Sequence, residues 1–167
     1  MTKSFLWVAA LMGTWFLCSS DIAPYRNSGY APFFMERAEL ERSVFRADTA
    51  AAIVDPGKIW IDGNNIYIVE RYKGVHIVDN TDPAAPRNTG FIVAPGCMDV
   101  AVRDGVMYLD NAVDLVTFDL ESDSVTSRLK NFLPEPMSPT GEYYYGSRHG
   151  EMILVGWKRV EKTEERR

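Results

Sequence analysis

The feature that most constrains the fold is a set of short apolar strands that recurs after about 40 residues. In the first unit, turn residues separate the segments KIWID, IYIVE and GVHIVD, and MDVAV, VMYLD and DLVTFD follow in the same order in the second unit. Tyr108 stands 41 positions after Tyr67, and Asp119 stands 40 positions after Asp79. Alternating apolar runs between Gly and Asp turns predict antiparallel strands, and this period is typical of β-propeller blades.

We therefore expect an all-β fold of two to three antiparallel four-stranded blade-like repeats, forming part of a β-propeller. The repeat domain is predicted at residues 58–160, with units at 58–97 and 98–137 and a partial unit at 138–160. A closed propeller needs at least about four blades, so this chain is expected to leave strand edges open. Open edges invite pairing with other chains. A homo-oligomer or an envelope protein partner is therefore expected.

The residues before the repeats are predicted to form a linker with a short helix, within 21–57. In the segment 34–45, FMERAELERSVF, Leu40 and Val44 stand four positions apart, a spacing that favours a helix. The last residues, 161–167, read EKTEERR and are predicted to be a charged tail.

The first 20 residues are predicted to be a secretory signal. Lys3 precedes an apolar run from Phe5 to Leu17. A membrane-spanning helix needs about 20 apolar residues, so this run is too short to span, but it fits the apolar region of a signal peptide. We therefore expect export to the cell envelope, as an outer-membrane lipoprotein or a periplasmic protein.

Cys18 follows the apolar run directly and is the candidate for lipidation, which would anchor the protein to a membrane. The residues before it, Trp15 to Leu17, are larger than those that usually precede a lipidated cysteine. Ordinary cleavage after Ser20 is therefore the alternative. The second cysteine, Cys97, is expected to be a small buried residue rather than a nucleophile.

The segments GVHIVDNTDPAAPRNTGFI and DLVTFDL resemble the LVIVD repeat family. The segments DPGKIWIDGNNIYIVE and APGCMDVAVRDGVMYLD are similar to the parts of those proteins that precede this strand. The resemblance covers about residues 30–160 and is strongest from 55 to 120. It implies an exported lipoprotein of Bacteroidetes-type bacteria with a propeller-like fold, and it implies no particular reaction. Familiar members carry several more repeats than this chain.

The segment GVHIVDNTDP places His76 close to two aspartates and raises the question of a reactive or metal-binding site. The second unit has Val116 where His76 stands but keeps an aspartate at the strand end. We therefore interpret the aspartates as residues that hold turns and His76 as a strand side chain, with ligand binding as its alternative. The residues predicted to shape the turns are Asp79, Asp82, Pro83 and Asp119.

Tyr143 and Tyr145 are the other candidate ligand-binding residues. In a strand, alternate positions share a face, so the two rings could stack together on a glycan or peptide. Core or cross-strand packing is the simpler interpretation. No metal site and no cofactor are predicted, because the acidic turn at 119–123 lacks the glycine and the closing glutamate of a calcium loop.

No catalytic residue is predicted. The sequence has two histidines and contains no nucleophile elbow, phosphate-binding loop or dinucleotide fingerprint. The net charge of −5 argues against nucleic acid as a partner. The predicted function is a non-catalytic cell-envelope repeat protein that mediates binding or interaction. The alternative is an envelope hydrolase or carbohydrate-processing enzyme that uses acidic residues in a propeller-like cleft.

Overall fold

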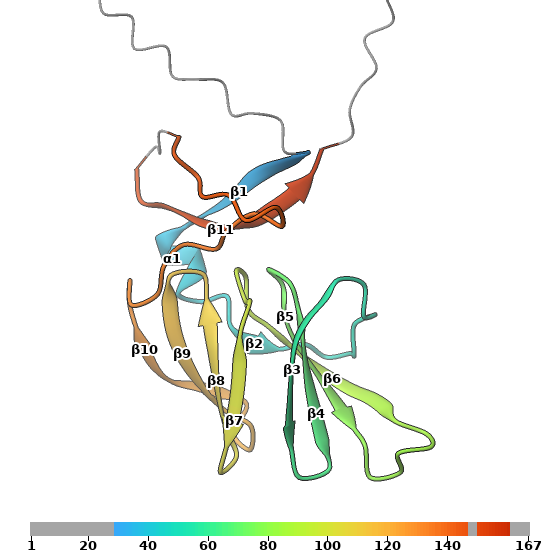
Figure 1. The fold of residues 1–167 in the computed structure, drawn as a ribbon. Coiled ribbons are helices and arrows are strands. Elements are labelled where there is room, and N and C mark those ends of the chain that lie inside the picture. The colour runs from blue at the N-terminus through green and yellow to red at the C-terminus, as the bar shows by residue number, and fades with distance from the viewer. Residues whose placement is uncertain (1–28, 147–149, 161–167) are drawn as a thin grey trace, which may run out of the picture.

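The computed structural model describes residues 29–146 and 150–160. These residues form eleven strands in three antiparallel sheets, which confirms the predicted all-β class (Figure 1). The predicted signal peptide, Cys18 and the charged tail lie outside the described residues. Within the described ranges, no helix is long and apolar enough to cross a membrane.

The first sheet contains four consecutive antiparallel strands and one added strand, in the order β2-β6-β5-β4-β3. Its strands are β2 (Phe45–Arg46), β3 (Pro56–Asp62), β4 (Asn65–Glu70), β5 (Gly74–Asp79) and β6 (Arg87–Val93). The strands β3 to β6 are the predicted first unit. Strand β2 comes from the predicted linker and pairs with β6 at the edge of the sheet.

The second sheet has four consecutive antiparallel strands in the order β10-β9-β8-β7. Its strands are β7 (Val100–Arg103), β8 (Val106–Asn111), β9 (Asp114–Asp119) and β10 (Ser124–Leu129). The two sheets share one register, because Tyr67 lies opposite Ile77 in the first and Tyr108 lies opposite Thr117 in the second. The predicted alignment of the two units is therefore confirmed at this strand pair.

The third sheet joins the two ends of the described chain. Strand β1 (Tyr30–Glu36) pairs antiparallel with β11 (Met152–Arg159), and this pair lies across one end of the two larger sheets (Figure 1). The partial unit predicted at 138–160 contains one described strand, β11, because residues 138–146 are not a strand. That segment makes a tight turn instead, since the Gly141 N–H donates to the Ser138 carbonyl and Gly141 has φ +81°.

The predicted short helix over 34–45 is also wrong. Only one turn, α1 (Arg37–Leu40), is helical, and Phe34 and Met35 belong to β1. Short helices gain little stability from their own backbone, so pairing with β11 decides the conformation of these residues. Leu40 is fully buried with Val155 of β11 and Ala112 of the second sheet, and it anchors α1 there.

The main core lies between the first and second sheets and is built from the apolar side chains on their facing surfaces. The first sheet contributes Tyr67, Val69, Val75, Ile77 and Ile92, and the second contributes Val100, Val102, Met107, Leu109, Val116 and Phe118. Alternate residues along each strand share a face, so this core leaves one face of each sheet turned outward.

Candidate interaction face and adjoining cavity

The outward face of the first sheet carries four isoleucines on two neighbouring strands. Ile59 pairs with Ile68, and Ile61 pairs with Ile66. Ile59 is 56% exposed and Ile61 is 66% exposed, while Ile66 and Ile68 are half-buried. We call these four residues the isoleucine face. Adjacent apolar side chains at a sheet surface are typical of a site that another surface covers.

The equivalent positions in the second sheet are buried. They stand 41 residues later, as two cross-strand pairs: Val100 with Leu109, and Val102 with Met107. None of these four side chains is more than 3% exposed, and all belong to the core between the sheets. The same face of the repeat is therefore covered in the second sheet. In the first sheet it is open at β3 and β4 and buried on β5 and β6, where His76 and Phe91 lie.

The surface that covers this face of the second sheet is the inward face of the first sheet. Tyr67 and Val75 belong to the shared core, and Trp60, which pairs with Tyr67, lies at its edge. The Trp60 indole N–H donates a hydrogen bond to the carbonyl oxygen of Val102 at 3.1 Å. This bond ties β3 to β7, the strands at the adjacent edges of the two sheets.

A cavity of about 700 Å³ adjoins the outward face of the second sheet. Ala101, Tyr108 and Leu115 line it from the sheet, and residues 133–139 line it from the segment that follows β10. Tyr108 is 42% exposed, whereas its equivalent Tyr67 is only 3% exposed. Within the described residues, the outward side of the first sheet thus carries the isoleucine face, and that of the second sheet carries the cavity face, which we define by Ala101, Tyr108 and Leu115.

Charged side chains surround part of the cavity. Lys58 and Asp99 form an ion pair, and Asp110 and Glu135 also line the space. The Asp110 Oδ1 atom accepts hydrogen bonds from the backbone N–H groups of Met98 and Asp99, both at 2.8 Å. Burial raises the pKa of Asp110, and these bonds offset only part of that increase.

Glu70 bonds the segment that precedes β3, as Asp110 bonds the segment that precedes β7. Its carboxylate accepts hydrogen bonds from the N–H groups of Val54 at 2.9 Å and Asp55 at 2.8 Å. Burial alone would raise the pKa of Glu70, but these donors, with His76 and Lys73, lower it. We did not predict roles for Glu70 and Asp110. Their signal in the sequence is an acidic residue near the end of IYIVE and of VMYLD.

His76 belongs to β5 of the first sheet, and its side chain has no exposed surface. Its Nε2 atom lies 3.3 Å from a Glu70 oxygen, its Nδ1 atom lies 3.3 Å from the Asn88 amide nitrogen, and its ring packs against Phe91. His76 does not line the cavity described above. A ligand in that cavity would therefore not reach its imidazole.

The predicted turn residues make local hydrogen bonds. Asp79 accepts from the Thr81 N–H at 2.9 Å and from Arg87 at 2.8 Å. Bonds from Thr81 and then from Arg87 lower the pKa of Asp79 to about 2. Asp119 accepts from the N–H groups of Glu121 and Ser122, and Asp82 accepts from the N–H of Ala84 before the chain leaves the Pro83 turn.

The two candidate tyrosines do not act as strand neighbours, because residues 138–146 are not a strand. Tyr143 lines the cavity and is 46% exposed. Tyr145 is 87% exposed and does not line it. The predicted shared face of the two rings is therefore wrong, and only Tyr143 can contact a molecule in the cavity.

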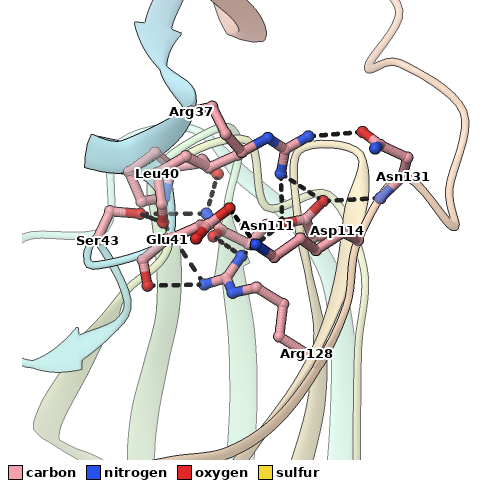
Figure 2. A network of polar contacts seen from close by, with 10 residues as sticks. Arg37, Leu40, Glu41, Ser43, Asn111, Asp114, Arg128 and Asn131 are labelled. Carbon is pink, nitrogen blue, oxygen red and sulfur yellow. Dashed lines mark hydrogen bonds and ion pairs between the residues drawn. The ribbon is translucent and has the colours of Figure 1, made fainter. Parts of the chain in front are cut away.

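A buried charge network joins α1 to the second sheet (Figure 2). Arg37 contacts both oxygens of Asp114 at 2.8 Å, and Arg128 contacts one of them at 2.8 Å. Asp114 has no exposed surface, and the Asn131 N–H also donates to it. Burial alone would raise the pKa of Asp114, but the two guanidinium groups and this N–H lower it. All charges in this network are paired, which favours a structural role.

In the part of the chain that the structure describes, no three His, Cys, Asp or Glu side chains are grouped closely enough to hold a metal ion. Cys97 is buried, and burial raises the pKa of its thiol, which lowers its reactivity. The isoleucine face and the cavity face are thus the candidate sites among the described residues. Comparison with known proteins found no matching family model, no matching curated protein and no matching solved structure.

Proposed function

We propose that this protein is a non-catalytic cell-envelope repeat protein that mediates interaction with another protein chain through the isoleucine face. The observation that carries the proposal is the contrast between Ile61, which is 66% exposed, and its equivalent Val102, which is 3% exposed. The second sheet uses this face to pack against another sheet. The first sheet offers the same face to a partner.

The energetics favour a covered state of this face. Fully burying an isoleucine side chain contributes about 1.5–3 kcal/mol relative to leaving it exposed. Ile59 and Ile61 are more than half exposed, so a partner that covers them would gain most of this free energy. The half-buried Ile66 and Ile68 would add to it.

Photocrosslinking tests the interaction. A photoreactive benzoylphenylalanine replaces Ile61 in cells that produce the full chain, and the same residue replaces the exposed Thr89 on β6 as a control. We expect a protein adduct from position 61 that position 89 does not give. If position 61 yields no protein adduct, the face does not mediate interaction and this function is wrong.

The proposal includes a propeller-like arrangement of the sheets, export and a lipid anchor at Cys18. The resemblance to the LVIVD repeat family supports the arrangement, and the apolar run from Phe5 to Leu17 supports export. Metabolic labelling with a fatty acid tests the anchor. We expect Cys18→Ser to abolish the label and the neighbouring Ser19→Ala to retain it. A labelled Cys18→Ser variant would contradict lipidation at this residue.

One observation favours the second candidate, an envelope hydrolase or carbohydrate-processing enzyme. Asp99, Asp110 and Glu135 line the same cavity, and the raised pKa of Asp110 would help it retain a proton as a general acid. Assays with chromogenic glycosides and esters test this candidate. Activity that Asp110→Asn abolishes, while the fold is retained, would favour it over the non-catalytic role.

A further inference from the structure

We propose that the partner of the isoleucine face is a second copy of this chain, which presents its cavity face in a head-to-tail contact. This inference rests on the proposed interaction function and names the partner. It follows from the way in which the first and second sheets already pack within one chain.

The contact between the two sheets provides the template. On one side lie Val100 and Val102 of the second sheet, and on the other side lie Tyr67 and Val75 of the first. The Trp60 indole reaches across to the Val102 carbonyl. This contact therefore has two halves: a second-sheet half with Val100 and Val102, and a first-sheet half with Tyr67 and Val75.

Each half occurs a second time in the chain. The isoleucine face is equivalent to the second-sheet half, since Ile61 stands 41 positions before Val102 and pairs in the same register. The cavity face is equivalent to the first-sheet half, since Ala101 and Tyr108 stand 41 positions after Trp60 and Tyr67, with Ala101 in place of the Trp60 indole. One chain thus carries one uncovered copy of each half of its own interface.

The cavity face is accessible for this contact. Tyr108 is 42% exposed, and the cavity of about 700 Å³ separates the sheet from parts of the 133–139 segment. Its lining from the second sheet includes Ala101 and Leu115, which suit aliphatic side chains. Aromatic residues such as Tyr108 are enriched at protein interfaces.

A contact between two different faces is heterologous, so its symmetry differs from that of a twofold dimer. An open series of copies keeps one free isoleucine face at one end and one free cavity face at the other until the series closes. Such a contact produces a ring if the rotation between copies closes, and an open filament if it does not. If two copies do not close the ring, the proposed assembly contains three or more copies.

Complementation between two variants tests the inference. We would purify the full chain in a mild detergent and measure its molar mass by light scattering over a wide concentration range. Ile61→Glu blocks one face and Tyr108→Glu blocks the other, and both side chains are exposed enough for the variants to fold. Circular dichroism checks that they do. Thr89→Glu, at an exposed site on β6, is the matched control.

We expect the wild type and Thr89→Glu to form assemblies and each blocking variant to be monomeric. An equimolar mixture of Ile61→Glu and Tyr108→Glu should form a species of twice the monomer mass, because one intact copy of each face remains. A monomeric wild type would overturn the inference. So would a Tyr108→Glu variant that assembles like the wild type, which would indicate contact between two isoleucine faces.

The crosslinking experiment separates this inference from the proposed function. An adduct at position 61 that contains two copies of the chain supports both. An adduct only with a different protein keeps the interaction function and overturns self-assembly. Absence of any adduct overturns both.

Discussion

The four consecutive strands β3 to β6 of the first sheet and β7 to β10 of the second have the same order, but the surroundings of the two sheets differ. Val102 and Leu109 of the second sheet are buried against the first sheet, whereas the equivalent Ile61 is exposed and Ile68 is half-buried. The repeat therefore encodes a face that is suited to burial, and the position of the unit in the chain decides whether that face is covered. This difference is the basis for our proposal that the isoleucine face is a site of interaction.

A second difference lies where the third strand of each unit begins. The first sheet has Gly74 there, with φ +149°, and an added Cβ atom would lie 1.9 Å from the Ile92 carbonyl oxygen. The equivalent residue of the second sheet is Asp114, the centre of the network with Arg37 and Arg128. At this position the first sheet needs a glycine, because the backbone of β6 lies close to it. The second sheet needs a carboxylate there, because two arginines bind it.

The largest expected effect is at this position. Asp114→Ala would leave Arg37 and Arg128 without their carboxylate, and removing one partner of a buried ion pair costs about 3–5 kcal/mol of unfolding free energy. Urea denaturation measures the loss. Asp48→Ala, at an exposed position outside the strands, should change stability by less than about 0.5 kcal/mol. Equal stability of the two variants would show that the network does not hold α1 to the second sheet.

A smaller effect than that of Asp114→Ala is expected when a side chain of the covered face, rather than one of the uncovered face, is truncated to alanine. Leu109→Ala should lower the unfolding free energy by about 2–5 kcal/mol, because the side chain is 1% exposed and its removal leaves a cavity. Ile61→Ala should cost about 0.5 kcal/mol or less, as at an exposed site, when urea denaturation is measured at concentrations where the protein is monomeric. A large loss for Ile61→Ala in the monomer would mean that the isoleucine face is covered within its own chain.

The smallest expected effect is that of replacing a turn aspartate, either Asp79 or its equivalent Asp119. The pKa of Asp79 is lowered from 3.8 to about 2, so its contribution to stability is present above pH 4 and is lost as the pH falls toward 2. The stability difference between wild type and Asp79→Asn should therefore shrink over this pH range.

Salt should distinguish the two turns. Asp79 contacts the exposed Arg87, whereas Asp119 contacts Ser122 and backbone N–H groups. The effect of Asp79→Asn should decrease with added salt, because exposed ion pairs are screened. The effect of Asp119→Asn, measured in the same thermal unfolding series, should change less. The same salt dependence in both variants would contradict a role for Arg87.

The strands of the two main sheets could be predicted because their information is local. Alternation in KIWID and IYIVE, with Asp-Gly turns between runs, defines which residues face the same side. The alignment of Tyr67 with Tyr108 is reproduced by the strand pairing. The acidic residues Glu70 and Asp110 recur near a strand end, but their backbone partners come from segments that the pattern does not connect to them.

The segments outside the two units could not be predicted in the same way. Phe34 and Met35 show a pattern that also fits a helix, and their strand conformation depends on a partner more than 100 residues away in β11. Arg37 and Asp114 are likewise brought together only by packing of α1 on the second sheet. Such long-range pairing leaves no periodic signal in either segment.

The sequence by itself determined the repeat, the strand register and the two-sided character of each sheet, because strand alternation and turn residues act over a few neighbouring positions. Only the tertiary structure decided which faces are covered, since coverage depends on what lies beside each sheet. Ile61 and Val102 have similar local sequences and opposite surroundings. That contrast, produced by the packing of one repeat on the other, defines the two open faces of this protein.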